Sequence, residues 1–542
     1  MADSGNSGEL IVLALKSAGV SKLFSLNGAH IWPLYTGAVE HGIDIVDTRH
    51  EQTATFAAEG WAKVTRECGV AAVTAGPGVT NSISAIAAAH SNDSPILVIG
   101  GRAPAARWGM GSLQEMDHVP LVKTITKDAF TVQSAAEAYD AAARSVALAL
   151  TPRSGPVYFD VPFDTFFGAE DLPAERPGIG PTAGLEPDPD QVATAARLLR
   201  DAQRPALIVG TGAYWAHAEA ELRMLAEAAD IAVYVNGLGR GMLPPHHRLF
   251  RSRSRSTGLG EADLVLVVGV PLDFRLNFGQ APVLSEEGRV VYIDSDDFRK
   301  HRPGAAALYG DIRKSLAALA EAARDTPRHP EWLELLAAKE AASRQRDRPL
   351  FESDSSPIHP ARVVAEVDRF LDRDAIVVGD GGDFVSFAGR YIERDNVGQF
   401  IDPGPFGCLG SGPGYALAAK LARPDKQVLL MEGDGAFGFS GMEFDTLIRH
   451  RVPVVCVIGN NGIWATEKHP MQSALGNAIA CDLRPGTRYD KVVEALGGHG
   501  ELVERPEDIR PALERAFKSG LPAVVNVLTD PTAEYPRSSV LM

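Results

Sequence analysis

The chain has 542 residues, of which 45% are hydrophobic, 23% charged and 7% aromatic. At about 150 residues per domain this length predicts three or four compact units, and the composition excludes a fibrous or disordered protein. The 53 basic and 69 acidic residues give a formal charge of -16. That charge argues against a general nucleic-acid-binding protein, but it leaves room for small anionic ligands, which need only a local cluster of donors.

The cysteines and the apolar runs indicate the cellular setting. Four cysteines are scattered along the chain without a CxxC pair, which argues against a disulfide framework or a zinc site and favours a reducing compartment (Cys68, Cys408, Cys456 and Cys481). The first residues lack the basic segment and long apolar stretch of a signal peptide, and no apolar run reaches the ~18 residues of a membrane span. We therefore expect a cytoplasmic enzyme with no membrane partner.

Short β-branched runs alternate with Ala/Leu-rich helical patterns along the whole chain. The predicted strands lie at 69–76, 95–101, 205–210, 231–236, 262–269, 289–294, 375–380, 426–435, 452–462 and 522–530. Helices are expected between them, for example at 81–93, 219–229 and 441–450. Short continuous apolar strands between helices are typical of parallel sheets that are covered on both faces.

Two segments break this pattern and are interpreted as linkers. Residues 167–190 are rich in Pro, Gly and acidic side chains, and residues 325–360 combine Pro-containing stretches with a short charged helical run. We therefore predict an α/β protein of three doubly wound parallel-sheet domains, at 1–168, 190–325 and 360–542. In such domains ligands bind beyond the carboxyl ends of the strands.

Two polar groups follow predicted strands of the last domain. Asp434 lies in a Gly-Asp-Gly turn after an apolar run, and Asn461 follows the next strand. The helix expected between them places both at one edge of a sheet, where their hard oxygen atoms suit Mg2+ and a bound diphosphate. Glycines allow the backbone to approach such a group closely. The alternative for the Gly-Asp-Gly turn alone is a simple strand ending.

Glu51 is the candidate catalytic acid of the first domain. It follows a β-run and stands at the start of an apolar helical pattern. The alternative is an acid that only stabilises the positive end of a helix dipole.

The order of these motifs resembles the acetolactate-synthase-like superfamily of thiamine-diphosphate enzymes. The resemblance covers essentially the whole chain and rests on residues 49–65, 75–101, 114–117 and 433–462. It implies a pyrimidine-binding, a central and a diphosphate-binding domain. It also implies a homodimer or homotetramer whose active sites lie between subunits.

Three segments are most similar to the 2-hydroxyacyl-CoA lyases and oxalyl-CoA decarboxylases of this superfamily: 432–443, 272–279 and 483–500. Other features are closer to acetolactate synthases. These are His50 before Glu51 and the Gln-Glu-Met-Asp stretch that begins at Gln114; Gly435 also stands where the lyases have Ser. The early loop 26–32 differs from that of the animal lyases.

The resemblance assigns roles to individual residues. Glu51 would contact the pyrimidine ring and activate thiamine diphosphate, and Leu409 would hold the cofactor in its bent form. Mg2+ would bind Asp434, Asn461 and the main-chain oxygen of Ile463. The remaining cofactor contacts are expected from backbone and side-chain groups of the loops after the strands (Gly381, Gly382, Asp383, Gly407, Gly433, Gly435 and Ala436).

Substrate contacts are predicted at separate places. His30 and Gln114 are candidate catalytic residues, and Trp464 is a candidate substrate contact. Coenzyme A would need cations, for which the candidates are Arg251, Arg253, Arg255 and the C-terminal pair Arg537 and Ser538, with a solvated loop and an unstructured terminus as the alternatives. Residues 210–212 form an incomplete dinucleotide fingerprint, so ADP or FAD in the central domain stays open.

The first functional hypothesis is a thiamine-diphosphate lyase that cleaves a 2-hydroxyacyl-CoA to a ketone or aldehyde and formyl-CoA. The alternative keeps the cofactor and changes the substrate, as in acetolactate synthesis or decarboxylation of oxalyl-CoA or another 2-oxo acid. A non-enzymatic homologue is disfavoured, because Glu51, Asp434 and Asn461 are all present.

Overall fold

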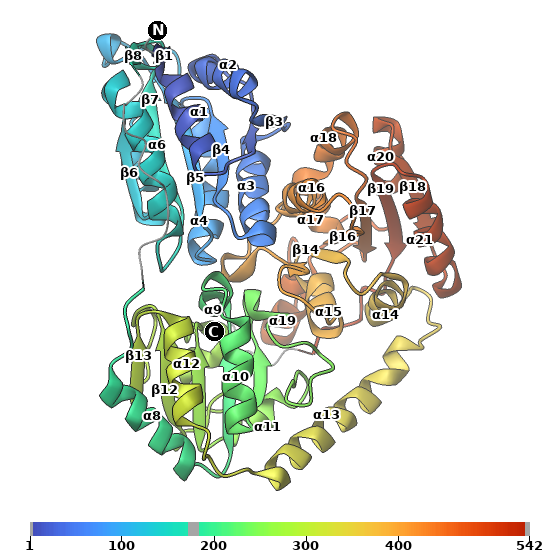
Figure 1. Cartoon of the computed structure of the whole chain (residues 1–542). Coiled ribbons are helices and arrows are strands. Elements are labelled where there is room, and N and C mark those ends of the chain that lie inside the picture. The colour runs from blue at the N-terminus through green and yellow to red at the C-terminus, as the bar shows by residue number, and fades with distance from the viewer. Residues whose placement is uncertain (1–3, 172–183, 537–542) are drawn as a thin grey trace. The chain divides into compact units, whose positions relative to one another are not determined.

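The computed structural model describes residues 4–171 and 184–536 of the chain. Three parallel sheets with flanking helices account for most of the described secondary structure (Figure 1). The α/β fold of three doubly wound parallel sheets is therefore confirmed. An additional antiparallel pair joins β1 (Ser4–Asn6) to β8 (Ala169–Asp171), inside the segment expected to be a linker.

The first sheet has the strand order β3-β2-β4-β5-β7-β6. Its strands are β2 (Lys22–Ser25), β3 (Asp44–Asp47), β4 (Gly69–Val73), β5 (Ile96–Arg102), β6 (Asp128–Thr131) and β7 (Val157–Pro162). Helix α1 (Ser7–Ser17) contacts α2 (Trp32–His41) and α6 (Ala135–Leu150), whereas α3 (Glu51–Thr65) contacts α4 (Pro77–Ser91).

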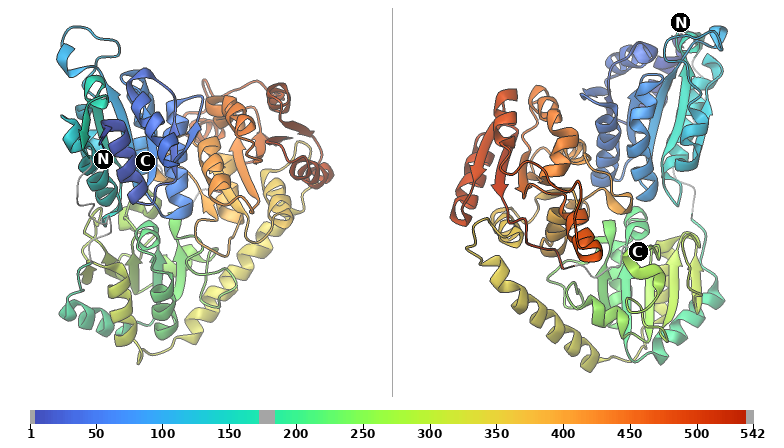
Figure 2. Two further views of the ribbon diagram at one scale, coloured as in Figure 1. Left: turned by 45° about the horizontal axis from the view of Figure 1, so that its top comes forward. Right: turned by 180° about the vertical axis from the view of Figure 1, so that it is seen from behind.

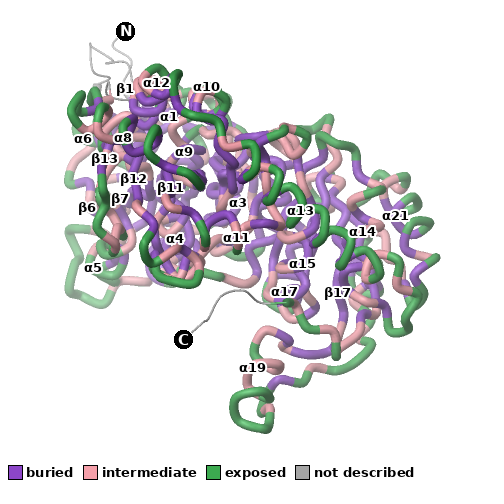
Figure 3. Tube along the Cα trace, turned by 90° about the horizontal axis from the view of Figure 1, so that it is seen from below, coloured by how far each residue is buried: buried purple, intermediate pink, exposed green. Residues whose placement is uncertain are grey.

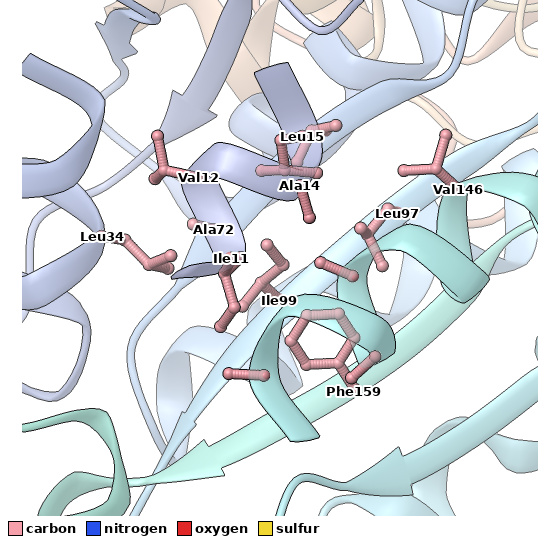
Figure 4. Packing of buried hydrophobic residues seen from close by; sticks show 14 of the residues in the cluster. Ile11, Val12, Ala14, Leu15, Leu34, Ala72, Leu97, Ile99, Val146 and Phe159 are labelled. Atoms are coloured by element: carbon pink, nitrogen blue, oxygen red, sulfur yellow. The ribbon is translucent and has the colours of Figure 1, made fainter. Parts of the chain in front are cut away.

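The side chains of β5 show that both faces of this sheet are covered by helices. Leu97 and Ile99 pack with Ile11, Leu15 and Phe159 in a fully buried cluster under α1 and α6 (Figure 4). Successive side chains of a strand point to opposite faces, so the equally buried Ile96 and Val98 face the other helices. The buried residues 96–99 of this strand are accordingly all apolar.

The middle sheet has the order β10-β9-β11-β12-β13. Its strands are β9 (Pro205–Val209), β10 (Ala232–Val235), β11 (Leu264–Val268), β12 (Arg289–Asp294) and β13 (Ala306–Tyr309). Helix α12 (Ile312–Ala322) contacts α8 (Pro189–Asp201) and α10 (Glu219–Ala229), whereas α11 (Arg255–Gly260) contacts α13 (Pro330–Phe351).

Helix α13 differs from the prediction for 325–360. A short helical run within a linker was expected, but the helix extends over 22 residues. Trp332 and Leu336, one helical turn apart, are buried in the core of the middle sheet, and the Trp332 Nε1–H donates to the Pro205 carbonyl at 3.1 Å. This anchoring, together with the polar contacts that Glu340 makes further along the helix, stabilises a helix whose remaining surface is largely polar.

The third sheet has the order β15-β14-β16-β17-β19-β18. Its strands are β14 (Ile376–Asp380), β15 (Phe400–Ile401), β16 (Val428–Gly433), β17 (Val455–Asn460), β18 (His499–Val503) and β19 (Ala523–Leu528). Helix α14 (Pro360–Phe370) contacts α21 (Ile509–Lys518), whereas α18 (Phe444–Arg449) contacts α16 (Gly412–Ala422) and α20 (Tyr489–Leu496). Two further views show the same strands from other sides (Figure 2).

The chain divides into two compact units. One comprises residues 1–182, 354–390 and 401–534 and holds the first and third sheets; the other comprises 183–353, 391–400 and 535–542 and holds the middle sheet. Inside the first unit, α3 packs directly against α16. The domain boundaries given by the sequence stay a prediction. No helix in the described segments has the length and apolar character to cross a membrane.

Candidate active site

Asp434 lies where β16 ends, as the first residue of α17 (Asp434–Ser440). Its Oδ1 accepts a hydrogen bond from the Gly435 amide at 3.0 Å, and its Oδ2 accepts one from the Gly462 amide at 2.8 Å. Burial raises the pKa of this carboxyl to about 6 despite these bonds. A nearby cation would offset that cost.

The loop after β17 brings the other two predicted metal ligands to the same edge. Gly462 lies between Asn461 and Ile463, so its bond to Asp434 joins the two loops. The Ile463 amide donates to Asn461 Oδ1 at 3.2 Å. A carboxylate, a side-chain amide oxygen and a main-chain oxygen form a hard donor set, which fits Mg2+. The assigned roles of these residues stay predictions.

Glycines line the ends of neighbouring strands. A Cβ added to Gly433 or Gly407 would meet nothing within 4 Å, so open space adjoins the backbone at two positions where contacts to the cofactor are expected. Gly381 has φ 128°, and a Cβ there would come within 3.1 Å of the Gly433 amide nitrogen. The loops after β14 and β16 are therefore neighbours, as the prediction for a diphosphate cradle requires.

Three other predicted cofactor residues lie beside these glycines. Gly382 faces Thr466, whose Oγ1 would be 2.0 Å from an added Cβ. Asp383 is buried at the start of α15 (Asp383–Tyr391), and Ala436 is buried in α17. The backbone at Gly382 thus has no room for a larger residue.

Asp380 was not found from the sequence, although it directly precedes the Gly381-Gly382 turn. It is fully buried, and its carboxyl accepts the Gly410 amide at 3.3 Å and the Gly412 amide at 2.6 Å. These bonds fix the backbone next to Leu409, which is half-buried. Burial raises the pKa of Asp380 to about 7. The signal available in the sequence was its place at the carboxyl end of a strand.

Glu51 is the first residue of α3, and its side chain is only 7% exposed. The Asn81 amide, on α4, donates to Glu51 Oε2 at 3.0 Å. His50 caps the same helix, because its Nδ1 accepts the Gln52 amide at 3.1 Å. Glu51 thus occupies the first position of a helix, where the helix dipole favours an acid. An acid that serves only this purpose on the surface needs neither burial nor a hydrogen-bond partner on α4, and Glu51 has both.

His30 and Gln114 lie together at the first sheet, 84 positions apart in the sequence. The Thr74 hydroxyl lies 3.1 Å from His30 Nδ1 and 3.4 Å from Gln114 Oε1. Gln114 adopts φ 59°, a left-handed conformation that costs energy in a residue with a Cβ. Burial lowers the pKa of His30 below its usual value, so its imidazole is mainly neutral at pH 7.

Trp464 directly precedes α19 (Ala465–Leu475) and packs on Gly435. A Cβ added to Gly435 would lie 2.4 Å from the indole ring, and the Phe439 ring meets the indole edge-on at 6.4 Å between centroids. Most residues of α19 are exposed or half-buried, whereas strand β17 is buried (Figure 3). The predicted substrate contact is therefore beside the Asp434 loop.

The arginines predicted for coenzyme A already have protein partners. Arg251 donates to the carbonyls of Arg248 and Phe250 at 2.7 Å, and Arg253 lies 3.4 Å from Asp347 Oδ2. Arg255 lies 3.5 Å from the Val235 carbonyl. The backbone of residues 252–254 donates three bonds to one Glu340 oxygen of α13. Arg537 and Ser538 lie outside the described residues.

The predicted residues form two groups. Glu51, His30 and Gln114 belong to the first sheet, and the Asp434 group belongs to the third. Among residues 4–171 and 184–536, no hydrogen bond of Glu51 or His30 reaches Asp434 or Asn461.

Three family models match the chain in order. They are the thiamine pyrophosphate enzyme N-terminal TPP binding domain at residues 5–121, the central domain at 192–319 and the C-terminal TPP binding domain at 380–527. The spacing of the three matches agrees with the three sheets.

Curated relatives align over nearly their full lengths. The acetolactate synthase large subunit of Mycobacterium tuberculosis is 54% identical, over 100% of this chain and 98% of that protein. The human 2-hydroxyacyl-CoA lyase 2 is 32% identical over 96% of this chain and 89% of that protein. A 2-hydroxyacyl-CoA lyase of Arabidopsis thaliana is 28% identical over 97% and 95%.

Proposed function

Because the chain belongs to the thiamine-diphosphate-dependent enzymes, we propose that it catalyses an acetolactate-synthase-type reaction. In that reaction a 2-oxo acid such as pyruvate loses carbon dioxide, and the remaining acyl unit is joined to the carbonyl carbon of a second 2-oxo acid. The relatives of that printed name at 54% identity support this proposal.

The choice of a 2-oxo acid over a coenzyme A substrate rests on the arginines of residues 251–255, which already have protein partners. Coenzyme A needs cations for its phosphates. The candidates Arg251 and Arg253 already bond to main-chain carbonyls and to Asp347, which leaves fewer of their donors for the phosphates of coenzyme A. A small 2-oxo acid makes no such demand, since a few donors beside the cofactor suffice to orient it.

Thiamine diphosphate, when bound, supplies a nucleophilic carbon and accepts the electron pair that is left when a bond next to a carbonyl breaks. The Glu51 carboxylate would exchange a proton with the aminopyrimidine ring of the bound cofactor, and Asn81 fixes the orientation of that carboxylate. Asp434, Asn461 and the Ile463 carbonyl would hold Mg2+, and the loops of Gly381 and Gly433 would contact the diphosphate. The neutral His30 can exchange a proton at a ring nitrogen.

The second candidate is cleavage of a 2-hydroxyacyl-CoA to a ketone or aldehyde and formyl-CoA. Its support is the three segments 432–443, 272–279 and 483–500, together with relatives named 2-hydroxyacyl-CoA lyase at 28% to 33% identity. Decarboxylation of oxalyl-CoA uses the same cofactor chemistry. In either case coenzyme A would need cations, for which Arg255 and Arg537 are further candidates.

One assay separates these candidates. The purified protein with thiamine diphosphate and Mg2+ is given pyruvate, a series of 2-hydroxyacyl-CoAs of increasing chain length, or oxalyl-CoA, and the products are identified by mass spectrometry. Acetolactate and carbon dioxide from pyruvate support the first proposal. Formyl-CoA or formate from a 2-hydroxyacyl-CoA, without acetolactate from pyruvate, would replace it by the second. The Glu51→Gln protein serves as the blank.

A further inference from the structure

A buried imidazole holds the turn that contacts His30 and Gln114. His118 is fully buried, and its Nε2 accepts a hydrogen bond from the Gly76 amide at 2.9 Å. Its Nδ1 lies 2.9 Å from Asp160 Oδ2. The ring therefore links the turn after β4 to Asp160 within β7, and neither link follows from a sequence motif.

The two bonds determine where the proton of His118 lies. A nitrogen that accepts an amide N–H carries no proton itself, so the proton is on Nδ1 and is donated to Asp160. Asp160 is fully buried and also accepts Arg102 at 3.0 Å and the Thr131 hydroxyl at 2.6 Å. These donors fix the carboxylate, and the carboxylate in turn fixes the tautomer and the orientation of the imidazole.

The turn that His118 holds is the one that contacts the candidate catalytic residues. Gly76 has φ 60° and ψ -110°, and a Cβ there would lie 2.9 Å from Gln114 Cβ. Two residues earlier, the Thr74 hydroxyl contacts both His30 and Gln114. His118 itself lies four positions after Gln114, so its hydrogen bond to the Gly76 amide also ties the Gln114 segment to this turn.

We propose that His118 is a positioning residue, which acts through the Gly76 amide and fixes His30, Thr74 and Gln114 relative to one another. The proposal rests on the proposed function in so far as His30 and Gln114 face the substrate. Burial makes this hydrogen bond important. If the acceptor is lost, the buried Gly76 amide has no water molecule to bond to and stays without a partner, which is energetically costly. A displacement of about 1 Å at a substrate-facing residue can cost on the order of 100-fold in rate.

Two polar variants separate the two bonds of the ring. In His118→Asn the side-chain amide reaches the position of Nδ1, so the bond to Asp160 is kept and the acceptor for Gly76 is lost. In His118→Gln the longer side chain places an oxygen near the position of Nε2, so the acceptor is kept and the bond to Asp160 is weakened. Tyr158→Phe is the matched control, since it removes a hydroxyl 3.4 Å from Asp160 without touching Gly76.

The first readout is hydrogen–deuterium exchange of the peptide that contains Gly76, measured without substrate. We expect H118N to exchange at least tenfold faster than wild type, and H118Q and Y158F to stay close to wild type. The second readout is turnover, with kcat/KM lowered by roughly 10- to 100-fold in H118N and restored in H118Q. Affinity for thiamine diphosphate should be the same in all four proteins, because His118 contacts neither Glu51 nor Asp434.

The outcomes are distinct. Protection of Gly76 in H118N equal to that of wild type, or loss of protection in H118Q equal to that in H118N, would overturn the positioning role. A wild-type protein that makes no acetolactate but shows the expected exchange pattern refutes the proposed reaction and leaves the role of His118 standing.

Discussion

Glu51 and its Asn81 partner place a carboxylate in a buried position at the start of α3. In Glu51→Gln the amide oxygen can still accept the Asn81 bond, so the fold should persist while proton exchange is lost. Because positioned acid–base groups contribute about 100- to 10,000-fold to rate, turnover should fall by at least about 100-fold. Glu67→Gln, an exposed carboxylate just beyond the same helix, is the control and should keep full activity. Equal turnover in E51Q and wild type would contradict the thiamine mechanism.

Asp434 is the side chain on which the predicted metal site depends. In Asp434→Asn the Gly435 and Gly462 amides lose a charged acceptor and Mg2+ loses a charged ligand, so the concentration of Mg2+ needed for cofactor binding should rise at least about tenfold. Quenching of Trp464 fluorescence on titration with Mg2+ and thiamine diphosphate reports binding, because the indole packs on Gly435. Asp445→Asn, whose carboxylate pairs with Arg49 and Arg449, should bind as wild type does. An unchanged Mg2+ dependence in D434N would remove Asp434 from the metal site.

The sequence could predict site residues that are marked by their position at strand ends. Asp434, Asn461 and Gly381 each follow an apolar run, and parallel strands deliver such residues to one edge. Thr74, His118 and Asp160 could not be found in this way, because their significance lies in bonds between residues about 40 positions apart. No periodicity encodes such a bond, and a buried His or Asp in a sequence looks like any other.

Helices α3 and α16 are joined by a buried charged network. Lys63 and Glu59, both fully buried, lie 2.9 Å apart, and the Tyr415 hydroxyl of α16 donates to Glu59 at 2.6 Å. Lys63 also donates to the Asp402 carbonyl at 2.7 Å, and Asn92 donates to Glu59 at 2.9 Å. The helix that begins at Glu51 is thereby fixed to the segment that leads to Leu409.

Removing one partner of this pair should be costly. Lys63→Met leaves the Glu59 charge buried with only neutral donors, and breaking a buried pair in this way typically costs about 3–5 kcal/mol. We expect a clear fall in the urea midpoint of K63M, and partial recovery in the double variant Glu59→Gln with Lys63→Met. Arg510→Ala, which breaks an exposed pair with Glu514, should leave the midpoint unchanged. A K63M midpoint equal to that of wild type would show that the network does not hold α3 to α16.

Element by element, apolar runs predicted most of the sheet strands, because strands buried on both faces are largely apolar. The runs at 205–210, 262–269 and 452–462 contain β9, β11 and β17. Edge strands such as β18 were missed, since only one of its residues, Val503, is buried. Helix α13 was underestimated because its polar surface resembles a linker, and only Trp332 and Leu336 mark the anchored end. Strand order likewise depends on pairing between distant segments.

At the scale of the whole molecule, we expect the protein to form a homodimer or homotetramer in which each active site takes Glu51 from one subunit and Asp434 from another. Within one chain, each of these groups is hydrogen-bonded inside its own sheet. Mixing E51Q with D434N, at a Mg2+ concentration that saturates wild type but leaves D434N inactive, then creates hybrids in which one site has an intact Glu51 and an intact Asp434. With free exchange of subunits half of the dimers are hybrid, so activity should recover to roughly a quarter of the wild-type value. Each variant treated in the same way without the other is the control, and it should give no activity. If the mixture also stays inactive while mass spectrometry detects hybrids, each chain builds its site from its own residues.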